Sequence, residues 1–329
     1  MAEKILILRF SSIGDIVLTT PVVRCLKQQI PGVRVHYALK KQFHSIIAFN
    51  PYIDKIHVLD NSLKQLIKEL KKEQFDLIID LHNNFRTLQI KLQLGVKSIS
   101  FPKLNIEKWL QVNFKINRLP NMHIVDRYLK TVESLGVKND GRGLDYFIPE
   151  NDKVIVTEIS NTLRDGFTAV VIGAMHFTKK LPGEKLIELC NKISLPIVLV
   201  GGKEDKARGE AIAQSNPTKI FNACGMFSIN QSASVIQQAN NVFTHDTGMM
   251  HIAAAFQKDI ISIWGNTIPE FGMYQYFGQN ISLHDLRQQG KIVEVKSLSC
   301  RPCSKIGYTK CPKGHFLCMR SIDFSKLNY

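Results

Sequence analysis

The stretch that decides the fold is KILILRFSSIGDIVLTTPVVRCLKQQ, residues Lys4–Gln29. Its first part, Lys4–Arg9, is a mainly apolar run with the length of a buried strand. Gly14 and Asp15 mark a turn, and Ile16–Gln29 then carries apolar residues at helical spacing. A strand, a glycine turn and a helix in this order predict the first unit of a doubly wound α/β domain.

The same alternation continues along the rest of the chain. In the first half, we expect strands at Val33–Ala38, Lys55–Leu59 and Leu77–Leu81 and helices at Lys41–Phe49 and Ser62–Glu73. In the second half, we expect strands at Thr168–Ile172, Pro196–Val200, Lys219–Phe221, Asn241–Thr244 and Ile260–Trp264, and helices at Gly183–Ile193, Asp205–Gln214, Ile229–Ala239 and Met249–Phe256. This order predicts two Rossmann-like domains with parallel sheets. The Gly-, Asp- and Asn-rich stretch 139–152 places their boundary, giving domains of residues 1–150 and 151–329.

Composition places the chain among ordinary globular proteins. Of its 329 residues, 44% are hydrophobic and 22% are charged. No apolar run approaches the roughly 18 residues of a membrane-spanning helix. The first apolar stretch, Ile5–Leu8, is shorter than the roughly 7–15 residues of a signal-peptide core, so we expect a cytoplasmic protein. The net charge of +15 favours anionic partners such as nucleotides, nucleic acid or an anionic membrane surface.

Four of the seven cysteines crowd the C-terminal end of the chain. Cys300, Cys303, Cys311 and Cys318 follow the pattern C-x2-C-x7-C-x6-C. The C-x2-C pair is a common half of a zinc site, but the second half lacks the matching short spacing. A structural zinc or other metal, free thiols and disulfides therefore remain alternatives, and none of them requires a catalytic metal.

Polar residues follow several of the expected strands, at the edge where parallel sheets bind ligands. After the first strand, Asp15 is either a carboxylate that caps the next helix or a general base. In the loop GAMHFTKKLP, Gly173–Pro182, the side chains of Lys179 and Lys180 either meet a diphosphate or are simply solvated. Gly201-Gly202-Lys203-Glu204-Asp205 is either a ribose-binding turn or a plain turn.

The sharpest of these sites is THDTGMMHIAAAF, Thr244–Phe256. Asp246, Thr247 and Gly248 form a polar turn between a strand and an alanine-rich helix. Backbone N–H groups at the start of that helix, together with the helix dipole, make a natural cradle for a diphosphate. His251 lies one turn into the helix, where a core position and a ligand-side role are both open.

Taken together, these motifs resemble glycosyltransferase family 9, the bacterial ADP-heptose:lipopolysaccharide heptosyltransferases. The resemblance runs in order through RFSSIGDIVLTTPVVRCLK, LIIDLHNNFR, GAMHFTKKLP and THDTGMMHIAAAF, and the cysteine segment ending in Cys318-Met319 is similar to that of some members. It covers nearly the whole chain. It implies a GT-B fold, in which two Rossmann-like domains bind an acceptor in the N-terminal half and a nucleotide sugar in the C-terminal half.

The resemblance also implies roles for single residues. Asp15 matches the catalytic base, and Lys179 matches the lysine that meets donor phosphate and sugar. The further donor-side residues are Gly173, Lys180, Glu204, Asp205, Phe227, Asp246, Thr247, Gly248 and His251. The acceptor-side residues are Ser12, Gly14 and Arg86. The ribose contact belongs to either Glu204 or Asp205.

The implied reaction is inverting, metal-independent transfer of a heptose or related sugar from an ADP-sugar to an inner-core lipopolysaccharide precursor. No cofactor is required for catalysis, and nucleic acid is not an expected partner. The enzyme would work at the cytoplasmic face of the inner membrane. The alternative is a nucleotide-sugar epimerase or hydrolase on the same fold. By analogy with other GT-B proteins, we expect the last residues, Ser321–Tyr329, to cross back to the N-terminal domain.

Overall fold

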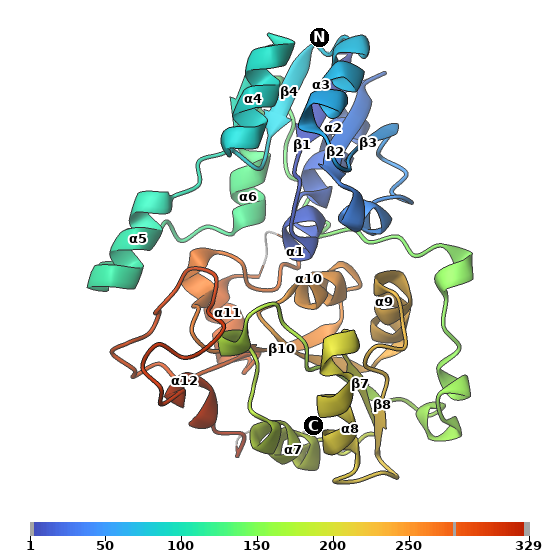
Figure 1. The fold of residues 1–329 in the computed structure, drawn as a ribbon, viewed down its shortest axis with the longest axis vertical. Helices are drawn as coiled ribbons and strands as arrows, with labels where there is room; N and C mark the ends of the chain where they lie inside the picture. The colour runs from blue at the N-terminus through green and yellow to red at the C-terminus, as the bar shows by residue number, and fades with distance from the viewer. Residues whose placement is uncertain (1–2, 279–280, 326–329) are drawn as a thin grey trace. The chain divides into compact units, whose positions relative to one another are not determined.

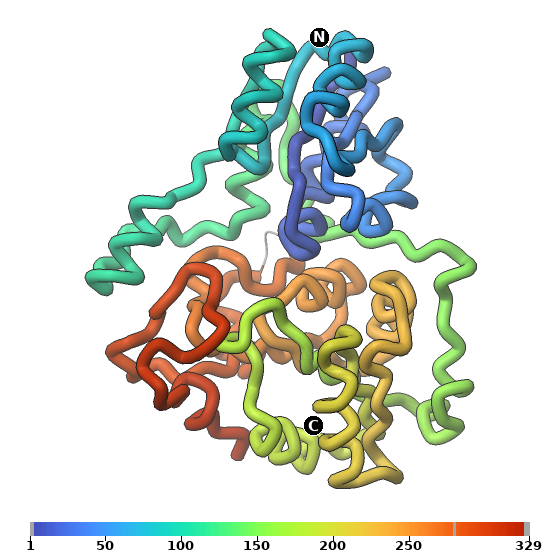
Figure 2. Tube along the Cα trace, in the orientation of Figure 1, coloured from blue at the N-terminus to red at the C-terminus, as the bar shows by residue number. Residues whose placement is uncertain are grey.

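The structure is a computed structural model, and it describes residues 3–278 and 281–325 (Figure 1). The described chain divides into two compact units. The first unit holds residues 3–104, 122–147 and 276–278, and the second holds residues 105–121, 148–275 and 281–325. Figure 2 allows the segment 105–121, which belongs to the second unit, to be followed along the trace. The chain changes unit after residue 147, and residues 105–121 and 276–278 also belong to the unit other than that of their neighbours in the sequence.

A five-stranded parallel sheet forms the centre of the first unit. Its strands are β1 (Lys4–Leu8), β2 (Arg34–Lys40), β3 (Lys55–Leu59), β4 (Leu77–Asp80) and β5 (Ser98–Ser100), in the order β3-β2-β1-β4-β5. Its helices are α1 (Ile13–Val17), α2 (Thr20–Gln29), α3 (Leu63–Lys72), α4 (Phe85–Leu94) and α6 (Ile124–Leu129). Short 3-10 helices lie at Lys41–Ile46 and Glu133–Leu135.

Alternating side chains of β1 serve both faces of this sheet. Leu6 and Leu8 belong to the core cluster that includes Leu66 and Leu70 of α3 and Ile90 of α4. Ile5 and Ile7 are equally buried, and α2 and α6 pack against each other beside the sheet. Burying each such side chain contributes about 1.5–3 kcal/mol to the stability of the fold. The apolar strand β1 therefore stabilises the packing on both faces of the sheet.

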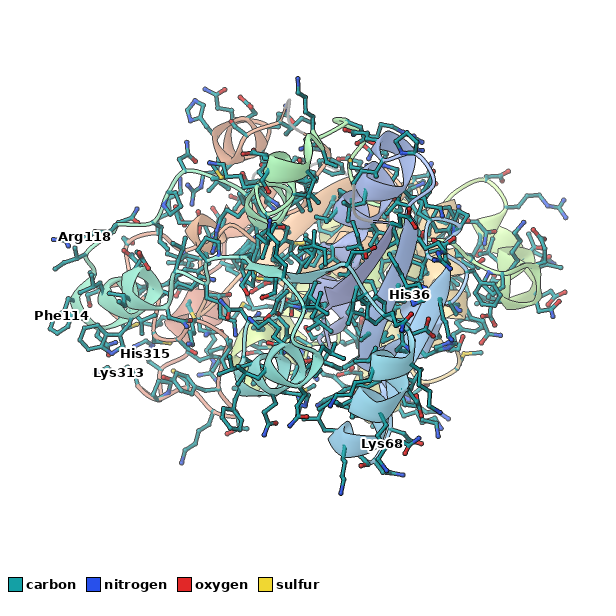
Figure 3. All side chains as sticks on the ribbon, turned by 90° about the horizontal axis from the view of Figure 1, so that it is seen from above. His36, Lys68, Phe114, Arg118, Lys313 and His315 are labelled. Atoms are coloured by element: carbon teal, nitrogen blue, oxygen red, sulfur yellow. The ribbon has the colours of Figure 1, made fainter. Side chains whose placement is uncertain are left out.

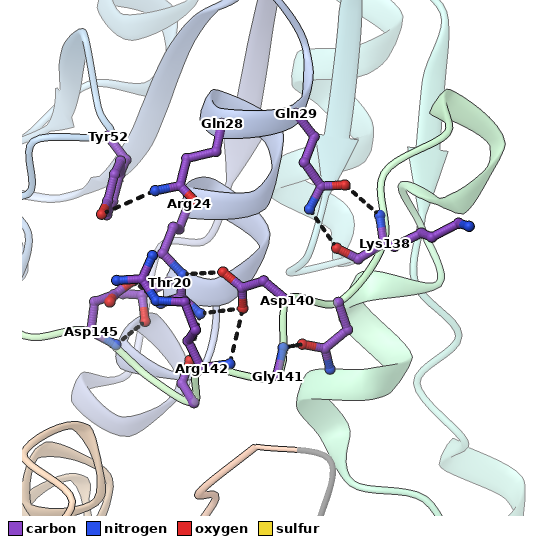
Figure 4. A network of polar contacts seen from close by, with 12 residues as sticks. Thr20, Arg24, Gln28, Gln29, Tyr52, Lys138, Asp140, Gly141, Arg142 and Asp145 are labelled. Atoms are coloured by element: carbon purple, nitrogen blue, oxygen red, sulfur yellow. Dashed lines mark hydrogen bonds and ion pairs between the residues drawn. The ribbon is translucent and has the colours of Figure 1, made fainter.

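A buried arginine fixes the segment that follows α6 (Figure 4). The guanidinium of Arg24 has no exposed side-chain surface and donates to both carboxylate oxygens of Asp140, at 2.7 and 2.8 Å. It also pairs with Asp145, whose own backbone N–H donates to Thr20 Oγ1 at 2.9 Å. A charge buried in this way needs its full set of partners, so α2 and residues 140–145 are held as one piece.

The second unit contains a six-stranded parallel sheet. Its strands are β6 (Thr168–Val171), β7 (Ile197–Val200), β8 (Ile220–Asn222), β9 (Asn241–His245), β10 (Asp259–Trp264) and β11 (Ile292–Glu294), in the order β11-β10-β9-β6-β7-β8. Its helices are α5 (Asn105–Phe114), α7 (Gly183–Lys192), α8 (Lys206–Ala213), α9 (Ile229–Gln238), α10 (Gly248–Ala255), α11 (Leu283–Gln288) and α12 (Leu317–Arg320). Short 3-10 helices lie at Glu150–Asp152, Val156–Glu158, Asn161–Leu163, Phe177–Lys179, Lys203–Asp205 and Pro269–Phe271.

One face of this sheet is covered by α7 and α8 together with the C-terminal segment. Leu186 and Leu189 of α7 share a core cluster with Met319, Ile322 and Phe324. The described part of the last residues therefore packs in the second unit, while residues 326–329 of the segment expected to cross back lie outside the described residues. Within the described chain, no helix is both long enough and apolar enough to span a membrane.

The doubly wound α/β architecture predicted from the sequence is confirmed, but two helices differ from expectation. The helix expected over Ile16–Gln29 is split into α1 and α2. The hydroxyls of Thr19 and Thr20 donate to backbone carbonyls three residues earlier, and Pro21 has no N–H to continue the helix. The helix expected over Lys41–Phe49 is a 3-10 helix that ends at Ile46.

Candidate functional site

The second unit changes its winding direction between β6 and β9. These strands are neighbours, but the chain continues from β6 to β7 and β8 on one side, and from β9 to β10 and β11 on the other. The loops that leave their carboxyl ends therefore diverge. In open α/β sheets, this is where ligands bind.

Lys179 and Asp246 meet at this point. Lys179 ends the 3-10 helix Phe177–Lys179 in the loop after β6, and Asp246 directly follows β9. Lys179 Nζ lies 2.5 Å from Asp246 Oδ2 and 3.3 Å from the Asp246 carbonyl oxygen. Thr267 Oγ1 donates to the same Oδ2 at 2.8 Å. The ion pair is partly exposed, so an anionic ligand can reach the ammonium and ligand hydroxyls can reach the carboxylate.

A buried histidine anchors the loop that carries Lys179. His245, the last residue of β9, accepts a hydrogen bond at Nε2 from the backbone N–H of Leu181, at 3.0 Å. Burial lowers the pKa of His245 to about 3, so its ring is neutral and able to accept. Neither His245 nor Thr267 is among the residues predicted from the sequence. The adjacency of His245 to Asp246 was the available signal.

Helix α10 begins directly after this ion pair. Thr247 is the residue before the helix and has an extended backbone, and Gly248 is its first helical residue. The first N–H groups of a helix have no partner within it and carry partial positive charge. His251 lies in the first turn and is buried, with 2% of its surface exposed.

The two acidic residues expected near a ribose lie in different environments. Asp205 is buried, accepts from Lys180 Nζ at 2.7 Å and from the Gly202 N–H at 3.1 Å. A Cβ at Gly173 would lie 2.5 Å from Asp205 Oδ2, so glycine is required for this close approach. Glu204 is exposed. Of the pair, only Glu204 presents its carboxylate to solvent, while Asp205 and Lys180 hold the two loops together.

Phe227 lies in the turn between β8 and α9 and is partly exposed. The loops after β6, β7, β8 and β9 leave the same edge of a parallel sheet. The second unit thus brings the predicted donor residues to one edge.

The first unit has its own change of winding direction, between β1 and β4. Asp15 follows β1 and lies in the first turn of α1, where its Oδ2 accepts from Ser12 N at 3.1 Å and from Ser12 Oγ at 2.7 Å. Its other oxygen pairs with Arg9. Burial alone would raise the pKa of Asp15, but the Arg9 guanidinium and the Ser12 hydrogen bonds outweigh it and hold the pKa below its usual value. The carboxylate is therefore ionised at neutral pH.

Arg9 links the two loops of this site, a role that was not predicted from the sequence. It donates to the Leu81 carbonyl after β4 at 2.5 Å and to Tyr128 Oη at 3.0 Å. Arg86, at the start of α4, places its guanidinium 5.6 Å from the centre of the Phe10 ring.

His82 was also not predicted, and it lies in the loop that leads from β4 to α4. Its ring meets Phe10 edge-on, 6.0 Å between centroids, and burial lowers its pKa to about 4. Gly14, expected on the acceptor side, is buried within α1, whereas Ser12 is exposed.

The four C-terminal cysteines are free thiols, and Cys300 Sγ lies 3.9 Å from His315 Nε2. Burial raises the pKa of the Cys318 thiol to about 12. Among the described residues, the group of three potential metal ligands whose atoms all lie within 4.8 Å of one another is His36, His57 and Glu73, not the cysteines. Glu73 already pairs with Lys4 and Lys55.

The sequence model of glycosyltransferase family 9 (heptosyltransferase) matches residues 63–301, which is well over half of the chain. The chain belongs to glycosyltransferase family 9. It is therefore a glycosyltransferase, as the motifs predicted.

Curated members of family 9 extend the match beyond this region. The chain is 24% identical over 296 residues to lipopolysaccharide heptosyltransferase 1 of Campylobacter coli, covering 80% of this chain and 84% of that protein. It is 24% identical over 278 residues to lipopolysaccharide heptosyltransferase 3 of Escherichia coli, covering 77% of this chain and 80% of that protein. These relatives give no support to the alternative of an epimerase or hydrolase.

Solved structures of family 9 members share the fold. A family 9 glycosyltransferase from Veillonella parvula aligns with a TM-score of 0.71 and 22% identity, covering 93% of this chain and 94% of that one. Escherichia coli heptosyltransferase WaaC, solved with ADP, aligns with a TM-score of 0.64 and 19% identity, covering 83% and 90%. The expected GT-B fold is confirmed by these alignments.

Proposed function

We propose that this enzyme transfers a heptose, or a closely related sugar, from an ADP-sugar to the inner core of a lipopolysaccharide precursor. The observation that carries the proposal is the meeting of Lys179 and Asp246 beside the start of α10. A cation, a carboxylate and free helical N–H groups match the diphosphate and hydroxyls of a nucleotide sugar. The similar proteins are named lipopolysaccharide heptosyltransferases, which supports heptose as the sugar. The WaaC structure was solved with ADP, which supports adenine as the base.

The reaction is a single displacement with inversion. The acceptor hydroxyl attacks the anomeric carbon of the donor, a new carbon–oxygen bond forms, and the bond to the ADP phosphate oxygen breaks. Asp15 takes the hydroxyl proton, because it is ionised at neutral pH. Lys179 and the N–H groups of Gly248 and Met249 stabilise the charge on the leaving diphosphate, where one such donor is typically worth about 2.7–4 kcal/mol.

Of the remaining donor-side residues, some contact the donor and the others hold the loops that surround it. Asp246 accepts from sugar hydroxyls, Glu204 holds the ribose and Phe227 faces the adenine. Gly173, Lys180 and Asp205 shape the loops around the diphosphate. Thr247 and His251 set the start of α10. On the acceptor side, Ser12 and Gly14 position Asp15, and Arg86 binds an anionic group of the acceptor.

Catalysis needs no metal in this proposal, because Lys179 and α10 provide the positive charge at the diphosphate. We further propose that any metal held by the four C-terminal cysteines is structural and takes no part in the transfer. Turnover that survives excess EDTA, with metal content measured in the same sample, tests both statements. Loss of turnover that Mg²⁺ restores would contradict the first statement. Metal-free protein that still unfolds cooperatively at the same temperature would contradict the second.

The membrane assignment follows from the acceptor. A lipopolysaccharide precursor is a lipid at the cytoplasmic face of the inner membrane, so the enzyme works there as a peripheral protein. Nucleic acid is not a partner in this proposal.

The deciding experiment is thermal unfolding with ADP, UDP, GDP and CMP at equal concentration. A ligand at 100 times its dissociation constant adds about 2.7 kcal/mol of stability. We expect stabilisation by ADP alone. Stabilisation by UDP or GDP instead would keep the transferase class and reject an ADP-sugar.

A second experiment separates transfer from hydrolysis. Consumption of ADP-heptose is followed with and without a lipopolysaccharide acceptor. We expect release of ADP to depend on the acceptor. Equal consumption in both samples would favour a hydrolase.

A further inference from the structure

Helix α5 leaves an unusual amount of apolar surface exposed. None of its residues is buried. Ile106 is 72% exposed, Trp109 54% and Phe114 58%. At about 100° per residue, these three positions fall within an arc of about 140°, so they share one side of the helix. The rings of Trp109 and Phe114 also contact each other edge-on, with centroids 5.2 Å apart.

The opposite side of α5 is attached to the second unit. The ammonium of Lys108 lies 5.8 Å from the centre of the Phe271 ring. Lys115, just after the helix, donates to the carbonyl oxygens of Pro302 at 2.6 Å and Cys300 at 3.4 Å. The apolar face is therefore held outward by contacts on the other side of the helix.

The segment to which Lys115 is attached is strongly basic. Residues 295–322 contain six Lys or Arg and no Asp or Glu. Lys305, Lys310 and Lys313 are exposed, and Ile306 and Tyr308 between them are exposed apolar side chains. In Figure 3, Phe114, Arg118, Lys313 and His315 lie on the same side of the view, and Figure 1 shows α5 and this segment on one side as well.

We propose that the exposed face of α5 and the basic segment 305–313 together form a docking surface for an anionic lipid bilayer. We call it the interfacial surface. Trp and Tyr favour the boundary between headgroups and acyl chains, and lysines beside them are attracted to anionic headgroups. An apolar face flanked by one sign of charge is the pattern of an interfacial helix. The docking brings the second unit to the surface where a lipid-linked acceptor resides, so it deepens the proposed function.

Tryptophan fluorescence tests the docking directly. The chain has two tryptophans, and Trp264 is buried, with 1% of its surface exposed. Emission changes on adding vesicles therefore report Trp109. We expect a blue shift, and quenching by brominated acyl chains, with vesicles of phosphatidylethanolamine and phosphatidylglycerol. Vesicles of phosphatidylcholine, or anionic vesicles at high salt, should give a much smaller change.

Paired variants separate the two components of the surface. We expect Trp109→Ala with Phe114→Ala, and Lys310→Glu with Lys313→Glu, each to weaken vesicle co-sedimentation by about tenfold or more. Ile155→Ala is the control for the apolar variant, and the double variant Lys153→Glu with Lys192→Glu is the control for the basic one. These controls change exposed side chains elsewhere in the second unit. The controls should bind as the wild type does.

Two results would overturn the proposal. One is the absence of any emission change or co-sedimentation with anionic vesicles. The other is an oligomer in solution that the Trp109 and Phe114 changes dissociate, which would make the surface an interface between copies of this chain. Stabilisation by ADP and turnover of a deacylated, soluble acceptor are measured on the same variants. Both should be retained, so failure of docking and failure of the transferase proposal give different results.

Discussion

At the scale of single residues, the acceptor-side carboxylate depends on its neighbour. Arg9 pairs with Asp15 and holds its pKa below the usual value, against a burial effect of opposite sign. A base with a low pKa binds a proton weakly, but it is ionised at neutral pH and so can accept one. The pairing therefore sets the lower pH limit of the proposed reaction.

Replacing Arg9 should move that limit. In Arg9→Gln, only the Ser12 hydrogen bonds still offset the burial of Asp15, so its pKa rises and kcat/KM begins to fall at a higher pH. In the wild type, protonation of Asp15 should cause a loss only at a pH below the ordinary range of an aspartate. The measurement is kcat/KM against pH for both proteins. Lys138→Gln, which removes an exposed positive charge elsewhere in the first unit, is the control. An unchanged acidic limb in Arg9→Gln would contradict the role of Asp15 as base.

The adjacent lysines of the donor loop offer a matched pair. Lys179 pairs with the partly exposed Asp246, whereas Lys180 pairs with the buried Asp205. Lys179→Met should lower kcat by about 10²–10³-fold, because charge on the departing diphosphate loses a donor. Lys180→Met leaves a buried carboxylate unpaired, so it should lower the melting temperature more than Lys179→Met does. Steady-state kinetics and thermal unfolding of both variants check this. Equal kcat losses would show that Lys179 has no special role.

At the scale of elements, the loop after β6 closes against the loop after β7 only because residue 173 lacks a side chain. Gly173→Ala would place a Cβ 2.5 Å from Asp205 Oδ2. We expect it to destabilise the protein by about 1–3 kcal/mol and to weaken ADP binding. Gly183, at the start of α7, has open space around its Cβ position, so Gly183→Ala should be neutral or slightly stabilising. Urea unfolding measures both. A Gly173→Ala protein as stable as Gly183→Ala would show that the loops can separate without cost.

Much of this element-level arrangement could be read from the sequence. Apolar runs predicted the strands, because residues buried on both faces of a parallel sheet must be apolar. Periodicity could not place the break at Thr19–Pro21, which depends on hydroxyl-to-carbonyl hydrogen bonds. Periodicity also did not predict α5, whose apolar face is exposed.

The candidate sites, too, could be predicted from the sequence only in part. Glycines and polar residues at strand ends predicted where Lys179 and Asp246 lie. The choice between Glu204 and Asp205 required burial, which adjacent residues of one turn do not reveal. Arg9, His82 and His245 act through partners distant in sequence, such as Leu81 for Arg9 and Leu181 for His245.

At the scale of the whole molecule, buried histidines tie stability to pH. Burial lowers the pKa of His57 and His82 to about 4 and that of His245 to about 3, below the ordinary value of 6.5. These rings stay neutral in the folded protein, while the unfolded chain takes up protons below pH 6.5. The unfolded state is then favoured by mass action, so stability falls as pH falls from about 6.5 toward 4.

The window between pH 6.5 and 5 is where protonation of the unfolded chain's histidines has its largest effect. Carboxylates with lowered pKa values, such as Asp15 and Glu73, remain ionised there in the folded state and largely ionised in the unfolded state. We expect the free energy of unfolding to decrease steadily over this window, with each histidine contributing up to about 1.4 kcal/mol per pH unit. His57→Gln should flatten the slope, because one proton acceptor of the unfolded state is removed. His44→Gln, at an exposed position, should leave the slope nearly unchanged. Urea unfolding at several pH values gives the slopes, and a wild-type stability that is constant or rises on acidification through this window would contradict the neutral, buried state of these rings.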